Sequence, residues 1–230
     1  MLFDLNHTLL TPPHYISTPL YQQLVKYKQF KNTDLGIVSG GTYDKVRRQL
    51  YDSFYLFNFI FCENGSHLLT PPHSTIYKNE LKENPQYSTC LQLMEDSNHF
   101  LKNKIVNYSP LQHLQVRDSM IYFHSLPKEI HLPLFRHLDF RKNIYSNEWV
   151  NPKVSILLSS NSLSIQPSEW NKSQVIPFLL KENYKNIHYF GDHNKPHYHD
   201  YPLLSHPLII SHPVIDSQHT LDILKILYTH

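Results

Sequence analysis

The chain has 230 residues, enough to bury one large hydrophobic core or two small ones, and 21 basic against 19 acidic residues leave a formal net charge of +2. This balance gives no reason to expect a nucleic acid or a membrane as a partner. No stretch approaches the roughly 18 apolar residues of a membrane span, the N-terminus lacks a signal-peptide pattern, and two cysteines are too few for a disulfide framework, so a reducing cytosol is expected.

The first third of the chain alternates predicted strands and helices. Strands are predicted at 1–5, 33–41 and 57–65, and helices at 18–30 and 42–51. This order is typical of a parallel sheet whose functional residues lie in the loops at the carboxyl ends of the strands.

The middle of the chain has a different rhythm, and the first pattern then returns. The middle contains predicted strands at 115–125, 154–160 and 162–168, and between them helical stretches such as 87–103. Without strict strand-helix alternation, these elements predict an α+β insert with an antiparallel sheet. After it come a helix at 172–183 that contains Pro177, strands at 186–193 and 207–211, and a closing helix at 217–228.

Four residues that suit phosphoryl transfer lie at the ends of predicted strands or at the start of a late helix. Asp4 lies near the end of the first predicted strand, Ser39 near the end of the second and Asp192 near the end of a late strand, while Lys172 opens the helix at 172–183. Strand ends of an open α/β sheet converge on one crevice. A carboxylate nucleophile, a hydroxyl and an ammonium for phosphate oxygens, and a second carboxylate for Mg²⁺ would together serve this chemistry.

Six stretches resemble the haloacid dehalogenase superfamily and, more closely, the eukaryotic-type phosphomannomutases. They are LFDLNHTLLTPP, GIVSGGTYDKVRRQL, FIFCENG, VRDSM, SEWNKSQVIPFLLKENYKNIHYFGDHNKPHYHDYPLL and SHPVIDSQHTLDILKIL, in the family's order. The resemblance implies an α/β fold. It would have a parallel, Rossmann-like haloacid dehalogenase core of residues 1–77 and 170–230, and an inserted α+β cap of residues 78–169 built on an antiparallel sheet.

The resemblance also implies an activity. Enzymes of this family interconvert mannose 6-phosphate and mannose 1-phosphate through an aspartyl-phosphate, as a step towards GDP-mannose. The implied cofactors are Mg²⁺ and a hexose 1,6-bisphosphate activator. The implied partners are a hexose phosphate substrate and a second copy of the chain, joined through the cap, with no nucleic acid and no membrane. The implied location is the cytoplasm.

Carried over position by position, the resemblance assigns roles in the core. Asp4 takes the place of the nucleophile and of a Mg²⁺ ligand, and the backbone carbonyl of Asn6 would be another ligand. Asp192 matches a Mg²⁺ carboxylate, and Asp200 falls where the family has an acidic residue. Lys172 matches the lysine that restrains the nucleophile and the transferred phosphate.

Substrate-binding positions follow in the same way. Ser39, with Gly40 beside it, or Gly41 falls at the phosphate hydroxyl position, since the register is ambiguous by two residues. In the cap, the substrate-facing positions correspond to Arg117, Lys128, Ser162 and Ser164.

The chain departs from the family at the proton-transfer position. Asn6 stands where the family has its general acid/base aspartate, and an amide cannot take or return a proton, a step typically worth ~10²–10⁴-fold in rate. His7, in the place of a glycine, has an ordinary pKa of about 6.5 that suits proton transfer. It can equally be an exposed loop residue.

Other departures fall on phosphate and sugar binding. Lys128 replaces an arginine and loses its bidentate fork, Ser164 replaces an aspartate, and another arginine falls near Pro13 and His14. Three functions therefore stay open: an active mutase, a catalytically impaired relative kept as a binding or dimerisation partner, and a phosphatase.

A histidine-rich loop allows one further alternative. His193, His197, His199 and Asp200 carry the side chains that Zn²⁺ prefers. The loose spacing equally fits histidines that bind no metal.

Overall fold

The computed structural model describes residues 1–11, 15–70, 74–145, 153–159 and 162–229. Pro13 and His14, which the family comparison placed near a substrate arginine, lie outside these ranges. The chain divides into two units. The first contains Met1–Lys78, Lys172–Pro196 and Asp200–His230, and the second contains Asn79–Asn171 and His197–His199.

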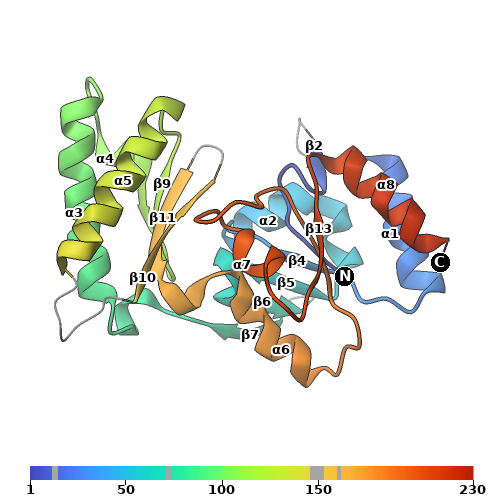
Figure 1. The fold of residues 1–230 in the computed structure, drawn as a ribbon. Helices are drawn as coiled ribbons and strands as arrows, with labels where there is room; N and C mark the ends of the chain where they lie inside the picture. Colours follow the sequence, from blue (N-terminus) through green and yellow to red (C-terminus); the bar gives the residue numbers. More distant parts are fainter. Residues whose placement is uncertain (12–14, 71–73, 146–152, 160–161, 230) are drawn as a thin grey trace. The chain divides into compact units, whose positions relative to one another are not determined.

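The first unit contains a seven-stranded sheet in the order β13-β12-β1-β4-β5-β6-β7 (Figure 1). The strands are β1 Leu2–Phe3, β4 Gly36–Val38, β5 Phe59–Cys62, β6 His67–Thr70, β7 Ser74–Lys78, β12 His188–Gly191 and β13 Ile210–Pro213. The five strands from β13 to β5 are parallel, and β6 and β7 are antiparallel. A short hairpin of β2 Leu10–Thr11 and β3 Tyr15–Ile16 lies outside this sheet. The mainly parallel sheet confirms the predicted α/β class.

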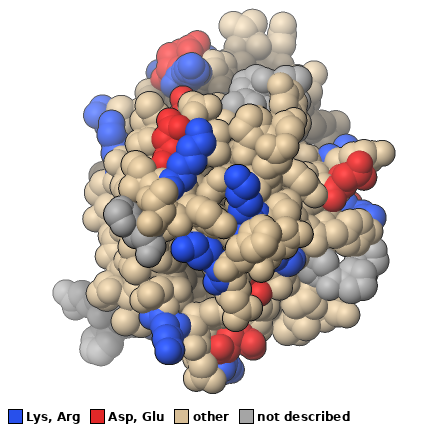
Figure 2. Space-filling view, turned by 90° about the vertical axis from the view of Figure 1, so that its right-hand side faces the viewer, with Lys and Arg blue, Asp and Glu red and all other residues tan. Residues whose placement is uncertain are grey.

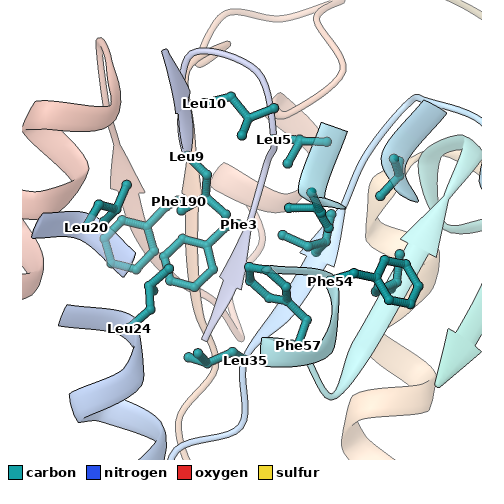
Figure 3. Close-up of a cluster of buried hydrophobic side chains, with 14 of the residues drawn as sticks. Phe3, Leu5, Leu9, Leu10, Leu20, Leu24, Leu35, Phe54, Phe57 and Phe190 are labelled. Carbon is teal, nitrogen blue, oxygen red and sulfur yellow. The ribbon is translucent and has the colours of Figure 1, made fainter. Parts of the chain in front are cut away.

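Alternating side chains of the central strands fill two cores, one on each face of the sheet. Phe3 and Phe190 point to one face, where their rings stack with centroids 4.9 Å apart (Figure 3). Leu2 and Tyr189, the preceding residues, belong to the core of the opposite face. Because both neighbours of β1 are strands, the residue that follows β1 is held in the middle of the sheet.

The helices of the first unit largely follow the predicted ranges. They are α1 Thr18–Phe30, α2 Tyr43–Leu50, α6 Ile176–Lys181, α7 Tyr201–Leu204 and α8 Ser217–Tyr228, with 3-10 turns at Tyr51–Leu56, Glu63–Gly65 and Lys172–Val175. The single helix predicted at 172–183 is wrong in its first turn. Pro177 lies in the first turn of α6, where its missing N–H is tolerated, and the preceding residues form the 3-10 turn instead.

The second unit contains a four-stranded antiparallel sheet in the order β10-β11-β9-β8. Its elements are β8 Leu114–Val116, β9 Ile121–His124, β10 Val154–Leu158, β11 Ser162–Pro167, α3 Tyr87–Lys104, α4 Pro110–His113 and α5 Lys128–Tyr145, with 3-10 turns at Leu81–Glu83 and Ser168–Trp170. The separate antiparallel sheet confirms the predicted α+β insert.

Two predictions for this unit need correction. The strand predicted at 115–125 is a hairpin of β8 and β9, closed where the N–H of Arg117 donates to the carbonyl of Met120 at 2.8 Å. Helix α5 was not predicted, since Pro133 interrupts its pattern. Its buried side chains, such as Leu134 and Leu138, share a core with Ile165 of β11.

A short segment of the histidine-rich loop belongs to the second unit. The N–H of Leu158 donates to the carbonyl of His197 at 2.8 Å, and the N–H of His199 donates to that of Leu158 at 3.3 Å. These bonds extend the end of β10 by one bridge, between Leu158 and Tyr198. Within the expected core range of 170–230, residues 170–171 and 197–199 fall in the second unit.

Figure 2 shows Lys and Arg side chains scattered among uncharged residues on the face that it draws. Among the helices of the described residues, none combines the length and the apolar character that a bilayer crossing requires. Cys62 and Cys90 are both buried free thiols.

Candidate active site

Asp4 directly follows β1, which lies between β12 and β4. Its N–H donates to the carbonyl of Phe190 at 2.8 Å, which continues the ladder with β12 and fixes residue 4 at the carboxyl end of the strand. The side chain is 13% exposed, and its Oδ1 accepts a hydrogen bond from Nζ of Lys172 at 2.5 Å. The structure thereby brings together two predicted groups that lie 168 residues apart in the sequence.

Lys172 is the charged centre of the cluster. Its side chain is 1% exposed, and Nζ donates to Oδ1 of Asp4 at 2.5 Å, to Oδ1 of Asp200 at 2.5 Å and to the hydroxyl of Tyr189 at 3.1 Å. A buried ammonium is stable only when it is paired and fully hydrogen-bonded, and three acceptors meet this need. Burial alone would lower the pKa of Lys172, but the two carboxylates outweigh burial and raise this pKa above its ordinary value.

Asp200 is the most completely bonded carboxylate of the site. Its Oδ1 accepts from the Tyr189 hydroxyl at 2.6 Å, and its Oδ2 accepts from the N–H groups of Asp192 and His193, each at 3.1 Å. Gly191 makes room for it, since a Cβ there would lie 2.9 Å from Cγ of Asp200. Burial opposes its ionisation, but Lys172 and these donors hold the pKa of Asp200 well below its usual range.

Asp4 has fewer donors and therefore behaves differently. Burial raises the pKa of Asp4 to about 7, because the charge of Lys172 only partly offsets burial and the neighbouring carboxylates of Asp200 and Asp192. Asp200 competes for the same ammonium. Asp200 therefore stays ionised, whereas ionising Asp4, at the predicted nucleophile position, costs free energy.

Asp192, His193 and Asp200 form the group of potential metal ligands that the described residues contain. One ligand atom from each lies within 4.8 Å of the other two. His193 Nδ1 is 2.8 Å from Oδ1 of Asp192 and 3.7 Å from Oδ2 of Asp200. The protonated ring of His193 forms an ion pair with Asp192 across this short contact. Two carboxylates and an imidazole grouped in this way could hold a divalent ion.

The charge state of His193 follows from the same neighbours. Burial lowers the pKa of its ring, but the carboxylates of Asp192 and Asp200 outweigh burial and raise this pKa to about 10. The predicted zinc set is brought together only in part. His197 and His199 do not belong to the group of close ligand atoms, and the ring of His197 packs against Phe135.

Asn6 lies in the loop after β1, held by a side chain from helix α2. Nε2 of Gln49 donates to Oδ1 of Asn6 at 2.9 Å. The next residue, His7, is exposed and has a left-handed backbone with φ 60°. A glycine adopts this backbone without strain, which agrees with the glycine that the resemblance puts at this position.

Ser39 directly follows β4, the strand beside β1. It is buried, its N–H donates to the carbonyl of Phe61 at 2.8 Å, and its Oγ accepts from the N–H of Gly41 at 3.0 Å. Gly40 lies between these two residues. Of Ser39 and Gly41, the two registers that the sequence left open, only Ser39 carries a hydroxyl.

The cap positions lie on the second unit. Ser162 and Ser164 alternate along β11 with buried Leu163 and Ile165, so the serines lie on the opposite face of that sheet from the hydrophobic core. Ser164 Oγ donates to Oε1 of Gln166 at 3.1 Å.

The two basic cap residues differ in their surroundings. The guanidinium carbon of Arg117 lies 3.6 Å from the ring centroid of Tyr122, and its Nη2 donates to Oε1 of Gln115 at 3.1 Å. Lys128 is exposed as the first residue of α5. The structure does not test what any of these cap residues binds.

Two residues of the site were not expected from the sequence. The hydroxyl of Tyr189 bonds both Lys172 and Asp200, and Gln49 bonds Asn6. A signal existed for Tyr189, which is the hydroxyl-bearing residue in a strand that ends in Gly-Asp. None existed for Gln49, which reads as an ordinary polar residue of a surface helix.

A mainly parallel core with a separate antiparallel α+β unit, and a carboxylate and a lysine meeting at the strand ends, define a protein of the haloacid dehalogenase type. Solved structures agree on this fold. The IMP-bound form of an N-terminally truncated IMP-nucleotidase from Plasmodium falciparum matches all of this chain and 68% of that chain, with a TM-score of 0.72 at 15% identity. A haloacid dehalogenase-like hydrolase from Bacteroides thetaiotaomicron matches 98% of both chains with a TM-score of 0.59 at 14% identity.

The family follows from the sequence comparisons. The model of the eukaryotic phosphomannomutase family matches residues 21–230. A phosphomannomutase of Babesia bovis is 24% identical over 91% of this chain and 89% of its own length. The chain belongs to the eukaryotic phosphomannomutase family.

Proposed function

We propose that this chain interconverts mannose 6-phosphate and mannose 1-phosphate through an aspartyl-phosphate on Asp4. The observation that carries the proposal is the Asp4–Lys172 contact at the end of β1, at 2.5 Å. In each transfer, an oxygen of Asp4 attacks phosphorus and the sugar oxygen leaves. The phosphoryl group then passes from Asp4 to the other sugar oxygen. Lys172 neutralises the carboxylate before transfer and the phosphate oxygens after it.

The cofactors and setting belong to the same proposal. Mg²⁺ would be held by Asp4, Asp192, Asp200 and the carbonyl of Asn6, and would neutralise charge on the transferred phosphate. A hexose 1,6-bisphosphate would load the nucleophile. The product would enter GDP-mannose biosynthesis in the cytoplasm, and a homodimer would form through the cap.

Substrate recognition is proposed for the remaining predicted residues. Ser39 and Gly40 would bind the phosphate at the strand end. On the cap, the hexose phosphate would be bound by Arg117, Lys128, Ser162 and Ser164. For Arg117 this requires the guanidinium to turn from Gln115 towards the phosphate.

A second function is favoured by one observation, the amide of Asn6. Its Oδ1 is bound by Gln49 at 2.9 Å, and an amide gives the transferred proton no acceptor. A catalytically impaired chain that still binds sugar phosphates, or pairs with an active mutase, would show this arrangement.

A coupled mutase assay on wild type and three variants separates the two functions. Wild type, Asp4→Asn and Asn6→Asp are compared with Mg²⁺ and a hexose 1,6-bisphosphate, and Asn186→Asp, on the surface, serves as the matched charge control. An active mutase predicts measurable wild-type turnover, its loss in Asp4→Asn, and a rate raised by up to ~10²–10⁴-fold in Asn6→Asp. A wild-type rate that survives Asp4→Asn would refute the proposed chemistry. Wild type and Asn6→Asp that are both inactive but bind mannose 1-phosphate would favour the impaired relative.

A further inference from the structure

The hydroxyl of Tyr189 lies inside the strand-end cluster of Asp4, Lys172 and Asp200, and the proposed function gives it no role. It donates to Oδ1 of Asp200 at 2.6 Å and accepts from Nζ of Lys172 at 3.1 Å. The ring that carries it is fully buried in the core on one face of the parallel sheet. Because such a core is close-packed, the ring has little room to move, and the sheet fixes the position of the hydroxyl.

Lys172, in contrast, reaches the cluster on a flexible stem of four carbons. Its ammonium has three N–H groups, and three acceptors surround it, namely the hydroxyl of Tyr189, Oδ1 of Asp200 and Oδ1 of Asp4. Tyr189 and Asp200 are buried and are bonded to each other. With two N–H groups anchored on this pair, the tetrahedral geometry of the ammonium directs the third at Asp4.

Strand β12 fixes both partners of the contact between Asp4 and Lys172. Leu2 of β1 pairs with Tyr189 in the parallel ladder, and the N–H of Asp4 donates to the carbonyl of Phe190, the next residue of β12. Adjacent residues of one strand therefore hold the backbone of the predicted nucleophile and one anchor of the lysine. This arrangement sets the distance between the carboxylate and the ammonium.

We propose that Tyr189 is a positioning residue that aims the ammonium of Lys172 at Asp4 and at a phosphoryl group bound there. The inference rests on the proposed function in taking Asp4 as the phosphoryl acceptor. When Asp4 carries the group, the N–H that faces it binds a phosphate oxygen, and the bonds to Tyr189 and Asp200 stay. Without the hydroxyl, one N–H loses its partner and the ammonium can turn away. A misplacement of ~1 Å can cost ~10²-fold at a reacting centre.

The test uses the full-length protein and BeF₃⁻, a stable mimic of a phosphoryl group on a carboxylate, in buffer with Mg²⁺ and without sugar. Fluorine NMR measures its affinity and resolves the signals of the bound fluorines. Tyr189→Phe removes only the hydroxyl. We expect this variant to bind BeF₃⁻ about tenfold or more weakly than wild type, with a shifted signal for the fluorine that faces Lys172.

Tyr27→Phe is the matched control. The hydroxyl of Tyr27 is also buried and donates to the carbonyl of Leu224 at 2.8 Å, within the same unit but outside the cluster. Its removal should lower the free energy of unfolding and leave both the affinity for BeF₃⁻ and the fluorine spectrum unchanged. A hydroxyl that only stabilises the fold would give this result at position 189 as well.

A crystal structure of the wild-type protein with BeF₃⁻ decides the question even if Tyr189→Phe fails to fold. Nζ of Lys172 should keep its bonds to Tyr189 and Asp200 and exchange only the bond to Asp4 for one to a fluorine. An ammonium that leaves Tyr189 to reach the fluorine overturns the proposal. Wild-type protein that binds no BeF₃⁻ overturns it too, and so does Tyr189→Phe with the affinity and spectrum of wild type.

The proposed function and the role of Tyr189 can fail separately, because no turnover is measured in this test. A chain without mutase activity whose binding of BeF₃⁻ depends on the Tyr189 hydroxyl would refute the proposed function and leave the positioning role in place. Mutase turnover together with BeF₃⁻ binding that ignores this hydroxyl would do the reverse.

Discussion

Polar groups have different surroundings at the strand ends of the first unit and on the face of the second unit's sheet that lies opposite its hydrophobic core. At the strand ends, Lys172 connects Asp4 and Asp200 through two contacts of 2.5 Å, and the cluster is buried. On the other sheet, Arg117 rests on Tyr122 and bonds Gln115, each a neighbour within the same hairpin. The buried charges of the strand-end cluster depend on one another and on distant parts of the fold. Arg117, in contrast, finds its partners among residues close to it in the sequence. Under the proposed function, the phosphoryl-transfer groups would depend on the fold, and substrate recognition would depend on side chains with local partners.

The largest effect on the free energy of unfolding is expected from a substitution that disrupts the buried cluster. Lys172→Met leaves two buried carboxylates without their shared cation and should lower the free energy of unfolding by about 3–5 kcal/mol near neutral pH. Urea unfolding followed by circular dichroism measures it. The loss should shrink in acid, where the carboxylates bind protons. Lys185→Met, an exposed lysine, should change stability by less than about 0.5 kcal/mol, and a similar small change for Lys172 would show that the cluster does not support the fold.

The next effect is a pH dependence that belongs to Asp4. Folding raises the pKa of Asp4 from 3.8 to about 7, so between these values the folded state binds more protons than the unfolded state. Stability from this group is therefore present below about pH 4 and is lost as the pH rises through about 7. Asp4→Asn removes this dependence. In metal-free buffer, its unfolding free energy minus that of wild type should grow by on the order of 2–4 kcal/mol between about pH 4 and pH 8.

Surface variant Asp52→Asn is the control for that comparison, and its difference from wild type should stay nearly flat over the same pH range. A flat difference for Asp4→Asn as well would mean that Lys172 compensates both carboxylates fully. The strand-end cluster would then store no free energy.

The sequence predicts local elements of this molecule better than contacts between distant elements. Strand ends were predictable because apolar runs and a following polar residue are local, and the helix at 217–228 was confirmed to the residue. The position of Tyr189 between Lys172 and Asp200, and the bond from Gln49 to Asn6, arise only when distant elements pack together. Helix α5 was not predicted because Pro133 interrupts its sequence pattern. Packing of the buried face of α5 against the core stabilises the helix despite this proline.

A smaller effect, on KM, is expected from a substitution of Arg117 in the second unit. If Arg117 binds the substrate phosphate, Arg117→Met should raise KM by about 10–100-fold, the equivalent of one charge-assisted contact, with kcat nearly unchanged. Steady-state kinetics measure both constants. Arg48→Met, on the exposed side of α2, is the matched control. An unchanged KM would assign Arg117 to packing on Tyr122, and substrate recognition would then have to come from other residues.

The smallest effect concerns backbone strain, and it separates two histidines that occupy glycine-like positions. His7 and His197 have φ values of 60° and 69°, a region that costs most L residues about 1–2 kcal/mol. His7 is exposed, so His7→Gly should relieve strain at the cost of chain entropy and raise the unfolding free energy by about 0.5 kcal/mol. His99→Gly, in the regular helix α3, should instead lower it by about 0.5–1 kcal/mol.

His197→Gly should raise the free energy of unfolding less than His7→Gly does, although the φ of His197 is larger. The substitution relieves backbone strain but also removes the contact between the His197 ring and Phe135. Urea unfolding of the three variants beside wild type measures the order His7, His197, His99 from gain to loss. If His7→Gly were as destabilising as His99→Gly, the histidine ring after Asn6 would have to stabilise the folded loop. His7 would then help to hold the loop that follows Asp4 rather than only occupy a strained turn.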